Sequence, residues 1–193
     1  MAPVITVPGL GGSEDDHWQT HLERSLPGAI RVHQDDWNRP DLSCWLARLE
    51  ECVESRPGSI LVAHSLGCIL VAHLAARRPA FSIAAAVLVA PADVESCRGT
   101  LRTTGSFAPI PRGELPFHAV VIASTNDPFM GYDRACELSR AWKAQFINAG
   151  ANGHINVASG HGRWRAGEDI VRALGAETNT ANRFAEAPMA RAS

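Results

Sequence analysis

One serine lies where a buried strand is expected to meet a helix. Ser65 follows the apolar run Ser59–Ala63 and precedes a helix-like stretch that ends near Ala76. A sharp turn at such a junction lifts the hydroxyl above the sheet edge, and small residues two positions away on either side, here Ala63 and Gly67, prevent side-chain clashes. The amides and positive end of the following helix favour an oxyanion. The pattern predicts a nucleophile elbow, with a simple helix N-cap as the alternative for Ser65.

A serine hydroxyl is a useful nucleophile only beside a base, and the base needs an acid to orient it. After a nucleophile elbow, the acid and then the histidine follow along the chain, at the C-terminal ends of later strands. Asp127 meets this condition, because it comes after the expected strand Ala119–Ala123 and is followed by Pro128. Asp133 is the competing acid, but it falls within the next helical pattern.

The expected base is His154. It follows the last expected strand, Gln145–Asn148, in a glycine-containing loop that could carry an imidazole across the sheet edge. His161, a few residues later, is the alternative. His118 precedes a strand and should therefore lie at the opposite end of the sheet. His64, next to the serine, is expected to shape the pocket or to pack.

A second group of residues could stabilise an oxyanion. The expected first strand, Val4–Val7, runs into a glycine-rich turn at residues 8–13, where the backbone can approach a substrate closely. We expect the backbone amides of Leu10 and Leu66 to form the oxyanion hole. The alternative is that residues 9–12 form only a tight turn. The expected pocket residues are Gly9, Gly11, Trp18, Trp37 and His64, although both tryptophans could equally belong to the core.

Strands and helices alternate along the chain, which predicts a mainly parallel sheet covered by helices on both faces. Further strands are expected at residues 29–32 and 83–89, and helices at residues 13–26, 41–53 and 132–144, the first of them capped by Ser13. A C-terminal helix should include Ile170–Leu174. We expect residues 1–175 to form one domain and residues 176–193, which lack apolar periodicity, to be a loose tail. The long connection at residues 93–113 could form part of a pocket wall.

Composition excludes several classes of protein. With 193 residues, 46% hydrophobic and 20% charged, the chain resembles an ordinary globular domain, and a net charge of −2 does not favour nucleic-acid binding. No apolar segment is long enough to span a bilayer and no secretory leader is evident, so a cytoplasmic location is expected. Histidines 17 and 21 have metal-like spacing but no evident third ligand, so no metal is expected. We expect buried free thiols at the five cysteines, Cys44, Cys52, Cys68, Cys97 and Cys136.

Five segments together resemble the retinoblastoma-binding protein 9-like (YdeN-like) family of small serine hydrolases, and they span most of residues 4–174. They are residues 8–13 with His17 and Trp18, residues 34–37 with Pro40, residues 63–67, residues 123–128, and residues 153–156 with Ser159 and Gly160. The resemblance implies an α/β-hydrolase fold, a three-layer sandwich with little or no lid. It also implies no cofactor and a catalytic triad of Ser65, Asp127 and His154.

Taken together, the residues and the resemblance predict hydrolysis of small carboxylic esters through an acyl-enzyme, with no nucleic acid or membrane as partner. The sequence does not indicate a protein partner. One alternative is a non-catalytic protein-binding module on the same fold, and another is an amidase or peptidase that uses the same triad. The sequence leaves the natural substrate and acyl-chain preference open.

Overall fold

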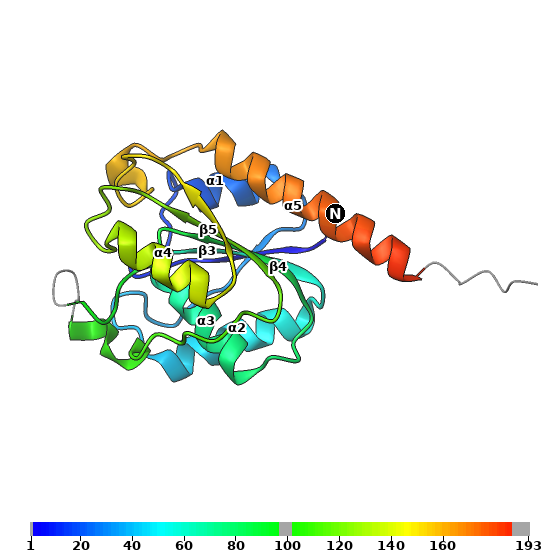
Figure 1. Cartoon of the computed structure of the whole chain (residues 1–193), viewed down its shortest axis with the longest axis horizontal. Coiled ribbons are helices and arrows are strands. Elements are labelled where there is room, and N and C mark those ends of the chain that lie inside the picture. Colours follow the sequence, from blue (N-terminus) through cyan, green and yellow to red (C-terminus); the bar gives the residue numbers. More distant parts are fainter. Residues whose placement is uncertain (1, 97–101, 187–193) are drawn as a thin grey trace, which may run out of the picture.

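Six parallel strands form the centre of the molecule. The computed structural model describes residues 2–96 and 102–186, and Figure 1 shows their arrangement. The strands lie in the order β2-β1-β3-β4-β5-β6, and every pair of neighbours is parallel. They are β1 (Val4–Val7), β2 (Ile30–Arg31), β3 (Ser59–His64), β4 (Ile83–Val89), β5 (His118–Ala123) and β6 (Gln145–Asn148). The parallel sheet expected from the alternating pattern is confirmed.

Helices cover both faces of this sheet. In Figure 1, α1 and α5 lie above the sheet and α2 and α3 below it. The helices are α1 (Trp18–Ser25), α2 (Leu42–Ser55), α3 (Leu66–Arg77), α4 (Tyr132–Ala141) and α5 (Arg165–Glu186). Two short 3-10 helices, η1 (Arg102–Phe107) and η2 (Val157–Ser159), lie in the connections. The described part of the long connection between β4 and β5 holds η1 and no longer helix.

Each central strand supplies both layers of the core. On β3, Leu61 and Ala63 pack with α2, α3 and α4 on one face, whereas Ile60 and Val62 pack with α1 and α5 on the other. This follows from the two-residue period of side chains along a strand. A strand that must be apolar on both faces reads as a nearly continuous hydrophobic run, as β3 does.

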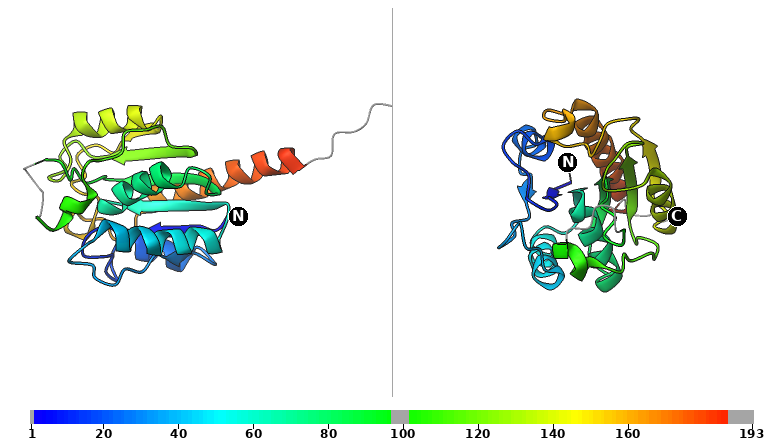
Figure 2. Two further views of the ribbon diagram at one scale, coloured as in Figure 1. Left: turned by 90° about the horizontal axis from the view of Figure 1, so that it is seen from below. Right: turned by 90° about the vertical axis from the view of Figure 1, so that its left-hand side faces the viewer.

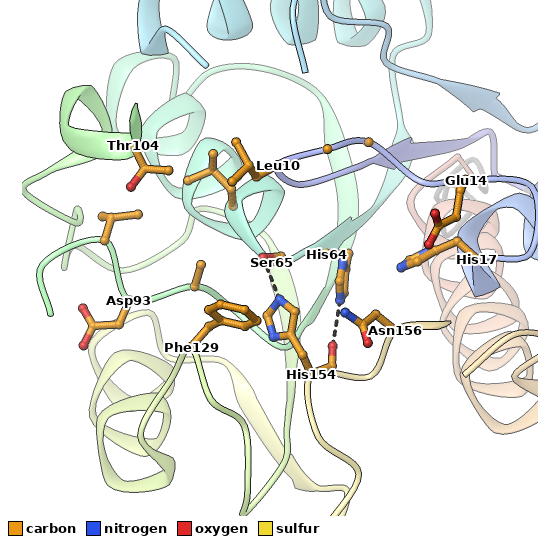
Figure 3. A pocket seen from close by; sticks show the side chains of 15 residues that line it. Leu10, Glu14, His17, His64, Ser65, Asp93, Thr104, Phe129, His154 and Asn156 are labelled. Carbon is orange, nitrogen blue, oxygen red and sulfur yellow. Dashed lines mark hydrogen bonds between the residues drawn. The ribbon is translucent and has the colours of Figure 1, made fainter. Parts of the chain in front are cut away.

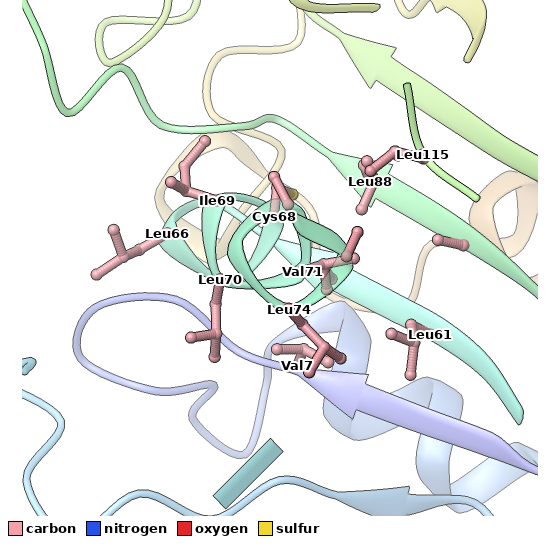
Figure 4. Packing of buried hydrophobic residues seen from close by; sticks show 14 of the residues in the cluster. Val7, Leu61, Leu66, Cys68, Ile69, Leu70, Val71, Leu74, Leu88 and Leu115 are labelled. Atoms are coloured by element: carbon pink, nitrogen blue, oxygen red, sulfur yellow. The ribbon is translucent and has the colours of Figure 1, made fainter. Parts of the chain in front are cut away.

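Helix α3 is the most deeply buried helix. Nine of its twelve residues are buried, and Figure 4 shows Ile69, Leu70 and Leu74 packed between the strands and the neighbouring loops. Because this helix begins directly after Ser65, its burial fixes the serine to the centre of the core. The nucleophile candidate therefore directly precedes a helix that is packed into the core.

The sheet order creates a crevice beside Ser65. The chain leaves β1 through α1 to reach β2 on one side, and it then crosses through α2 to β3 on the other side of β1. The segments that follow β1 and β3 therefore diverge to opposite faces. Ligands of open α/β sheets bind outside the carboxyl ends of strands at such a switch point. The glycine-rich turn and Ser65 both lie there.

Helix α1 begins later than the sequence pattern indicated. His17, rather than Ser13, is its N-cap, because the His17 Nδ1 accepts a hydrogen bond from the backbone amide of Gln19 at 3.2 Å. The Ser13 hydroxyl instead donates to the side chain of Gln19 at 2.6 Å. The acidic residues 14–16, expected in the first helical turn, form a turn before the helix.

Helix α5 extends beyond residue 175, where the sequence pattern placed the start of a tail. Helix α5 continues to Glu186, and Figure 2 shows its second half extending past the end of the sheet. Once nucleated, a helix propagates through residues of good intrinsic propensity, such as alanine and glutamate, without an apolar face. Residues 187–193 lie outside the described residues.

The cysteines are less buried than expected. Four of the five are described, and all four are free thiols, but only Cys68 is buried. Cys44 is exposed on α2, and Cys52 and Cys136 are half-buried. Their helices face the core with other residues, so the thiols lie on or near the outer side. Cys97 lies outside the described residues.

Candidate active site

Ser65 has a strained backbone at the junction of β3 and α3. Its φ of 55° and ψ of −121° lie outside the conformations that side chains usually allow, and its amide donates to the carbonyl of Val89 at 3.0 Å. The turn requires small neighbours. A Cβ at Gly67 would lie 2.2 Å from the carbonyl oxygen of Val7, and a Cβ at Gly9 would lie 2.8 Å from the Cβ of Ser65. Ala63 is fully buried, so the core accommodates the methyl group at this position.

The structure brings Ser65, His154 and Asp127 together. The Nε2 of His154 lies 2.8 Å from the Oγ of Ser65, and its Nδ1 lies 3.0 and 2.9 Å from the two carboxylate oxygens of Asp127. The Asp127 and His154 side chains are only 2% and 8% exposed. Because an ionised carboxylate can only accept hydrogen bonds, the Nδ1 of His154 carries the ring proton. Its Nε2 is then free to accept the proton of Ser65. Figure 3 shows the serine and the imidazole in this arrangement.

The loops that carry the acid and the base are bonded to each other. The amide of Gly153 donates to the Asn126 Oδ1 at 2.7 Å, and the amide of Asn152 donates to the Ser124 Oγ at 2.9 Å. The amide of Phe129 also donates to the Asp127 Oδ1 at 2.8 Å, which fixes the orientation of the carboxylate. The acid and the base are therefore positioned relative to each other before a substrate arrives.

Two ring N–H groups hold the backbone that follows the base. The Nε2–H of His64 donates to the carbonyl of His154, and the indole N–H of Trp18 donates to the carbonyl of Ile155, both at 2.9 Å. Ile155 has a φ of 47°, which is unusual for a β-branched residue. Such a conformation persists only where its surroundings enforce it. The two donors come from β3 and α1, so rigid elements determine where the imidazole lies.

Three imidazoles form a row beside the serine. The ring centroids of His17 and His64 are 4.8 Å apart, and those of His64 and His154 are 4.9 Å apart. Burial, with a smaller contribution from the charge of Arg31, lowers the pKa of His17 to about 4. Burial, followed by the nearby His154, lowers the pKa of His64 well below its usual value. At neutral pH both rings are therefore uncharged neighbours of the base.

A cavity of about 300 Å³ opens above Ser65. Its two sides differ in chemistry (Figure 3). On one side, which we call the apolar side, the side chains of Leu10 and Phe129 lie with the polar side chains of Thr104 and Asp93; on the other, the polar side, lie His17, Glu14 and Asn156. The remaining lining residues are Gly11, Gly12, His64, Leu66, Ala92, Val94 and His154. The expectation that the connection at residues 93–113 forms part of a pocket wall is confirmed, by residues 93, 94 and 104.

Comparison with known proteins places the chain in a family. The model of the serine hydrolase family matches residues 4–173. The chain belongs to this family. A YdeN-like hydrolase from Pectobacterium atrosepticum has 30% sequence identity and a TM-score of 0.81, and the alignment covers 92% of each chain. The resemblance to YdeN-like small serine hydrolases is therefore confirmed. None of the curated proteins matches the sequence.

More distant structures share the fold of the hydrolase. The ydeN gene product of B. subtilis is 20% identical, with a TM-score of 0.75 over 91% of this chain and 100% of that one. Est1E from Butyrivibrio proteoclasticus, solved with bound ferulic acid, is 13% identical, with a TM-score of 0.67 over 91% and 90%. The α/β-hydrolase fold expected from the sequence is confirmed.

Several expected site residues of this serine hydrolase lie elsewhere. Trp18 and Trp37 do not line the cavity: Trp18 is buried behind the base loop, and Trp37 packs against Trp45 and below Gly12. Gly9 contacts the elbow from behind rather than the cavity. Leu10, Gly11, Leu66 and His64 do line it.

The competing acid and bases lie away from Ser65. His161 accepts or donates hydrogen bonds within its own turn, with Ser159, and does not line the cavity. Asp133 is exposed on α4, and His118 begins β5 at the opposite end of the sheet. The sequence reasoning missed Phe129, whose ring lies 4.6 Å from that of His154. Phe129 follows the expected acid by two residues, and this position was the sign in the sequence that its ring could lie near the site.

The described residues contain no group of three or more histidine, cysteine, aspartate or glutamate side chains that could hold a metal ion. In the same part of the chain, no helix is long and apolar enough to cross a membrane.

Proposed function

We propose that this serine hydrolase is a carboxylesterase that cleaves small esters through an acyl-enzyme on Ser65. The observation that carries the proposal is the continuous set of hydrogen bonds from the Ser65 Oγ through the imidazole of His154 to the carboxylate of Asp127, with distances of 2.8, 2.9 and 3.0 Å. These distances are within the range that proton transfer to a general base requires.

The reaction has two similar halves. His154 takes the proton of Ser65 as its Oγ attacks the ester carbonyl, and the imidazolium then gives that proton to the departing alcohol. Water attacks the resulting acyl-serine with the same base, which releases the acid and restores the hydroxyl. Asp127 keeps the imidazole in the tautomer that can accept at Nε2 and stabilises the imidazolium that forms.

The backbone amides of Leu10 and Leu66 bind the oxyanion in this mechanism. Leu66 begins α3, and the first amides of a helix have no acceptor within it. Gly9 brings the turn after β1 against Ser65, because only a residue without a Cβ fits there. The next two amides, of Gly11 and Gly12, are already bonded to the carbonyls of Trp37 and Gly9. Leu10 is thus the amide of this turn that we assign to the oxyanion.

Small esters are favoured by the size and character of the cavity. A volume of about 300 Å³ lies at the lower end of the range for small-molecule sites.

The neutral imidazoles of His17 and His64 leave His154 as the only ring of the row that gains a proton during turnover. The positive charge therefore develops next to the leaving oxygen of the ester.

An active-site label separates catalysis from a binding role on the same fold. We expect a fluorophosphonate probe to label the wild type and not Ser65→Ala, with both proteins folded by circular dichroism. Absence of labelling in folded wild-type protein would contradict the proposal and favour the binding module. Turnover of paired butanoate esters and butanamides then distinguishes an esterase from an amidase, since an amidase would cleave both members of each pair.

A further inference from the structure

The polar side of the cavity has N–H groups that donate no hydrogen bond to any described residue. His17 uses Nδ1 to cap α1, so its single proton is on Nε2. His17 is only 4% exposed, and it lines the cavity with no acceptor for Nε2–H among the described residues. This N–H is accessible from the cavity, so a ligand oxygen can replace water as its hydrogen-bond acceptor.

Asn156 supplies a second such donor. Its Oδ1 accepts from the backbone amide of Ser159 at 3.1 Å, as part of a capping box at the start of η2. That bond identifies the oxygen of the side-chain amide and leaves the NH₂ group for the cavity. In Figure 3 the Asn156 amide nitrogen lies on the cavity side, near His64. No described residue accepts from this group.

Glu14 adds an acceptor at the rim. Its carboxylate lines the same side of the cavity and is exposed to solvent. A ligand carboxylate would be repelled by this charge, and an ammonium group would face the two N–H donors. A hydroxyl group can satisfy all three, because its two lone pairs can accept from His17 and Asn156 while its O–H donates to Glu14. The polar side is thus matched to an uncharged hydroxyl.

The position of the base indicates which part of an ester lies there. His154 must protonate the leaving oxygen, so the departing alcohol lies along the base and its loop. Asn156 is two residues beyond His154 on that loop, and His64 bonds the His154 carbonyl. The acyl group then occupies the apolar side of the cavity, near Leu10.

We propose that His17, Asn156 and Glu14 form an alcohol subsite, and that the preferred substrates are esters whose leaving alcohol carries a second hydroxyl group. The inference rests on the proposed esterase function and adds to it the chemical class of the alcohol. It predicts that a hydroxyl replaced by a methyl group of similar size weakens catalysis, because the donors of the subsite then remain unpaired.

Two esters of matched shape test this directly. 2-Hydroxyethyl butanoate and propyl butanoate differ only by a hydroxyl in place of a terminal methyl. We expect the wild-type kcat/KM to be about tenfold or more higher for the hydroxylated ester. A ratio near one, with both esters turned over, would overturn the alcohol subsite while leaving the esterase function intact.

Two variants locate the effect. Asn156→Asp keeps the capping oxygen and removes the NH₂ donor, and His17→Asn keeps a good N-cap and withdraws the Nε2–H. We expect each to lower the ratio several-fold, because kcat/KM should fall more for the hydroxylated ester than for propyl butanoate. Asn148→Asp is the matched control, because Asn148 also caps a turn through Oδ1, to the amide of Gly150, but does not line the cavity. Equal ratios in all four proteins would overturn the assignment.

A third ester fixes the direction, and the active-site label separates the two proposals. If propyl 4-hydroxybutanoate, with the hydroxyl on the acyl chain, is preferred instead, the polar side binds the acyl group and the assignment to the alcohol is wrong. If folded wild-type protein is neither labelled by the fluorophosphonate nor active on any ester, the esterase proposal fails and the subsite fails with it.

Discussion

Asp127 acts on Ser65 only through the tautomer of His154. In Asp127→Asn the shape is kept, but the new NH₂ group can donate to Nδ1, which places the proton on Nε2 and removes the acceptor for the serine. We expect kcat for a butanoate ester to fall on the order of 10³–10⁴-fold, as such a change does in serine proteases, with KM nearly unchanged. Steady-state kinetics measure both.

The matched control is Asp133→Asn, which removes an exposed carboxylate from the neighbouring helix α4. It should retain wild-type kinetics. A comparable loss of activity in Asp133→Asn, or full activity in Asp127→Asn, would mean that the acid has been misassigned.

The three residues of the candidate triad could be predicted because each follows a strand of recognisable pattern. Ser65, Asp127 and His154 stand after β3, β5 and β6, and parallel strands bring such positions to one sheet edge. The role of Trp18 could not be predicted in the same way. Its indole bonds a carbonyl 137 positions away along the chain, and an apolar residue at helical spacing is more often simply core. Only the tertiary structure shows which polar group such a ring reaches.

The base loop depends on the helix and strand behind it. In Trp18→Phe an aromatic ring remains, but the carbonyl of Ile155 loses its donor next to a strained backbone. We expect stability to fall by about 1–2 kcal/mol and kcat to fall about tenfold at nearly constant KM, because the imidazole is less well positioned. Urea denaturation and steady-state kinetics measure the two effects.

Trp142→Phe is the corresponding control. Trp142 is also buried, and its indole N–H donates to the carbonyl of Pro111 at 2.7 Å, away from the cavity. It should lose similar stability and keep its kcat. If both variants lose kcat equally, Trp18 is only a structural residue.

The contact between α3 and β1 is closer than a side chain permits. Gly67→Ala would place its Cβ 2.2 Å from the Val7 carbonyl oxygen, so the strand or the helix must move. We expect a loss of more than about 3 kcal/mol, since both elements are buried in the core. Gly113→Ala, where a Cβ meets no atom within 4 Å, should unfold at the wild-type urea concentration. Equal midpoints for the two variants would contradict the close approach.

The sequence patterns located the strands well but misplaced two helix boundaries, the end of α5 and the start of α1. The residues of β1, β4 and β6 coincide with the expected strands, because each is a short run with apolar residues that is bounded by turn residues. Helix α5 exceeds its expected length because the apolar periodicity used to predict it ends near Leu174, whereas the helical backbone continues to Glu186. The start of α1 was displaced because a histidine ring, which is not among the usual N-caps, occupies the cap.

At the scale of the whole molecule, burial of neutral imidazoles makes stability depend on pH. The pKa of His17 is about 4 in the folded chain, below the usual 6.5 of an unfolded one. The unfolded chain therefore takes up a proton first as the pH falls. The contribution of the neutral His17 to the free energy of unfolding is fully present above pH 6.5. It is lost between pH 6.5 and 4, by up to about 3 kcal/mol. The lowered pKa of His64 acts in the same direction.

Urea denaturation at pH 7, 5.5 and 4.5 measures this dependence. We expect His17→Asn to lose less stability on acidification than the wild type, because it has no buried imidazole at this position. His33→Asn, at an exposed position, should behave like the wild type. An unchanged pH dependence in His17→Asn would show that the native ring is protonated at least as readily as an unfolded one.

The loops after β5 and β6 are tied to each other by Ser124 and Asn126, whereas Ser65 belongs to the β3–α3 junction in the core. The site thus consists of two modules. One transfers protons and the other presents the reacting atom, and two hydrogen bonds join them: Ser65 to the imidazole of His154, and His64 to the backbone carbonyl of His154. A different nucleophile of similar size at position 65 would therefore inherit an intact proton relay, which makes this junction the natural place to redesign the chemistry.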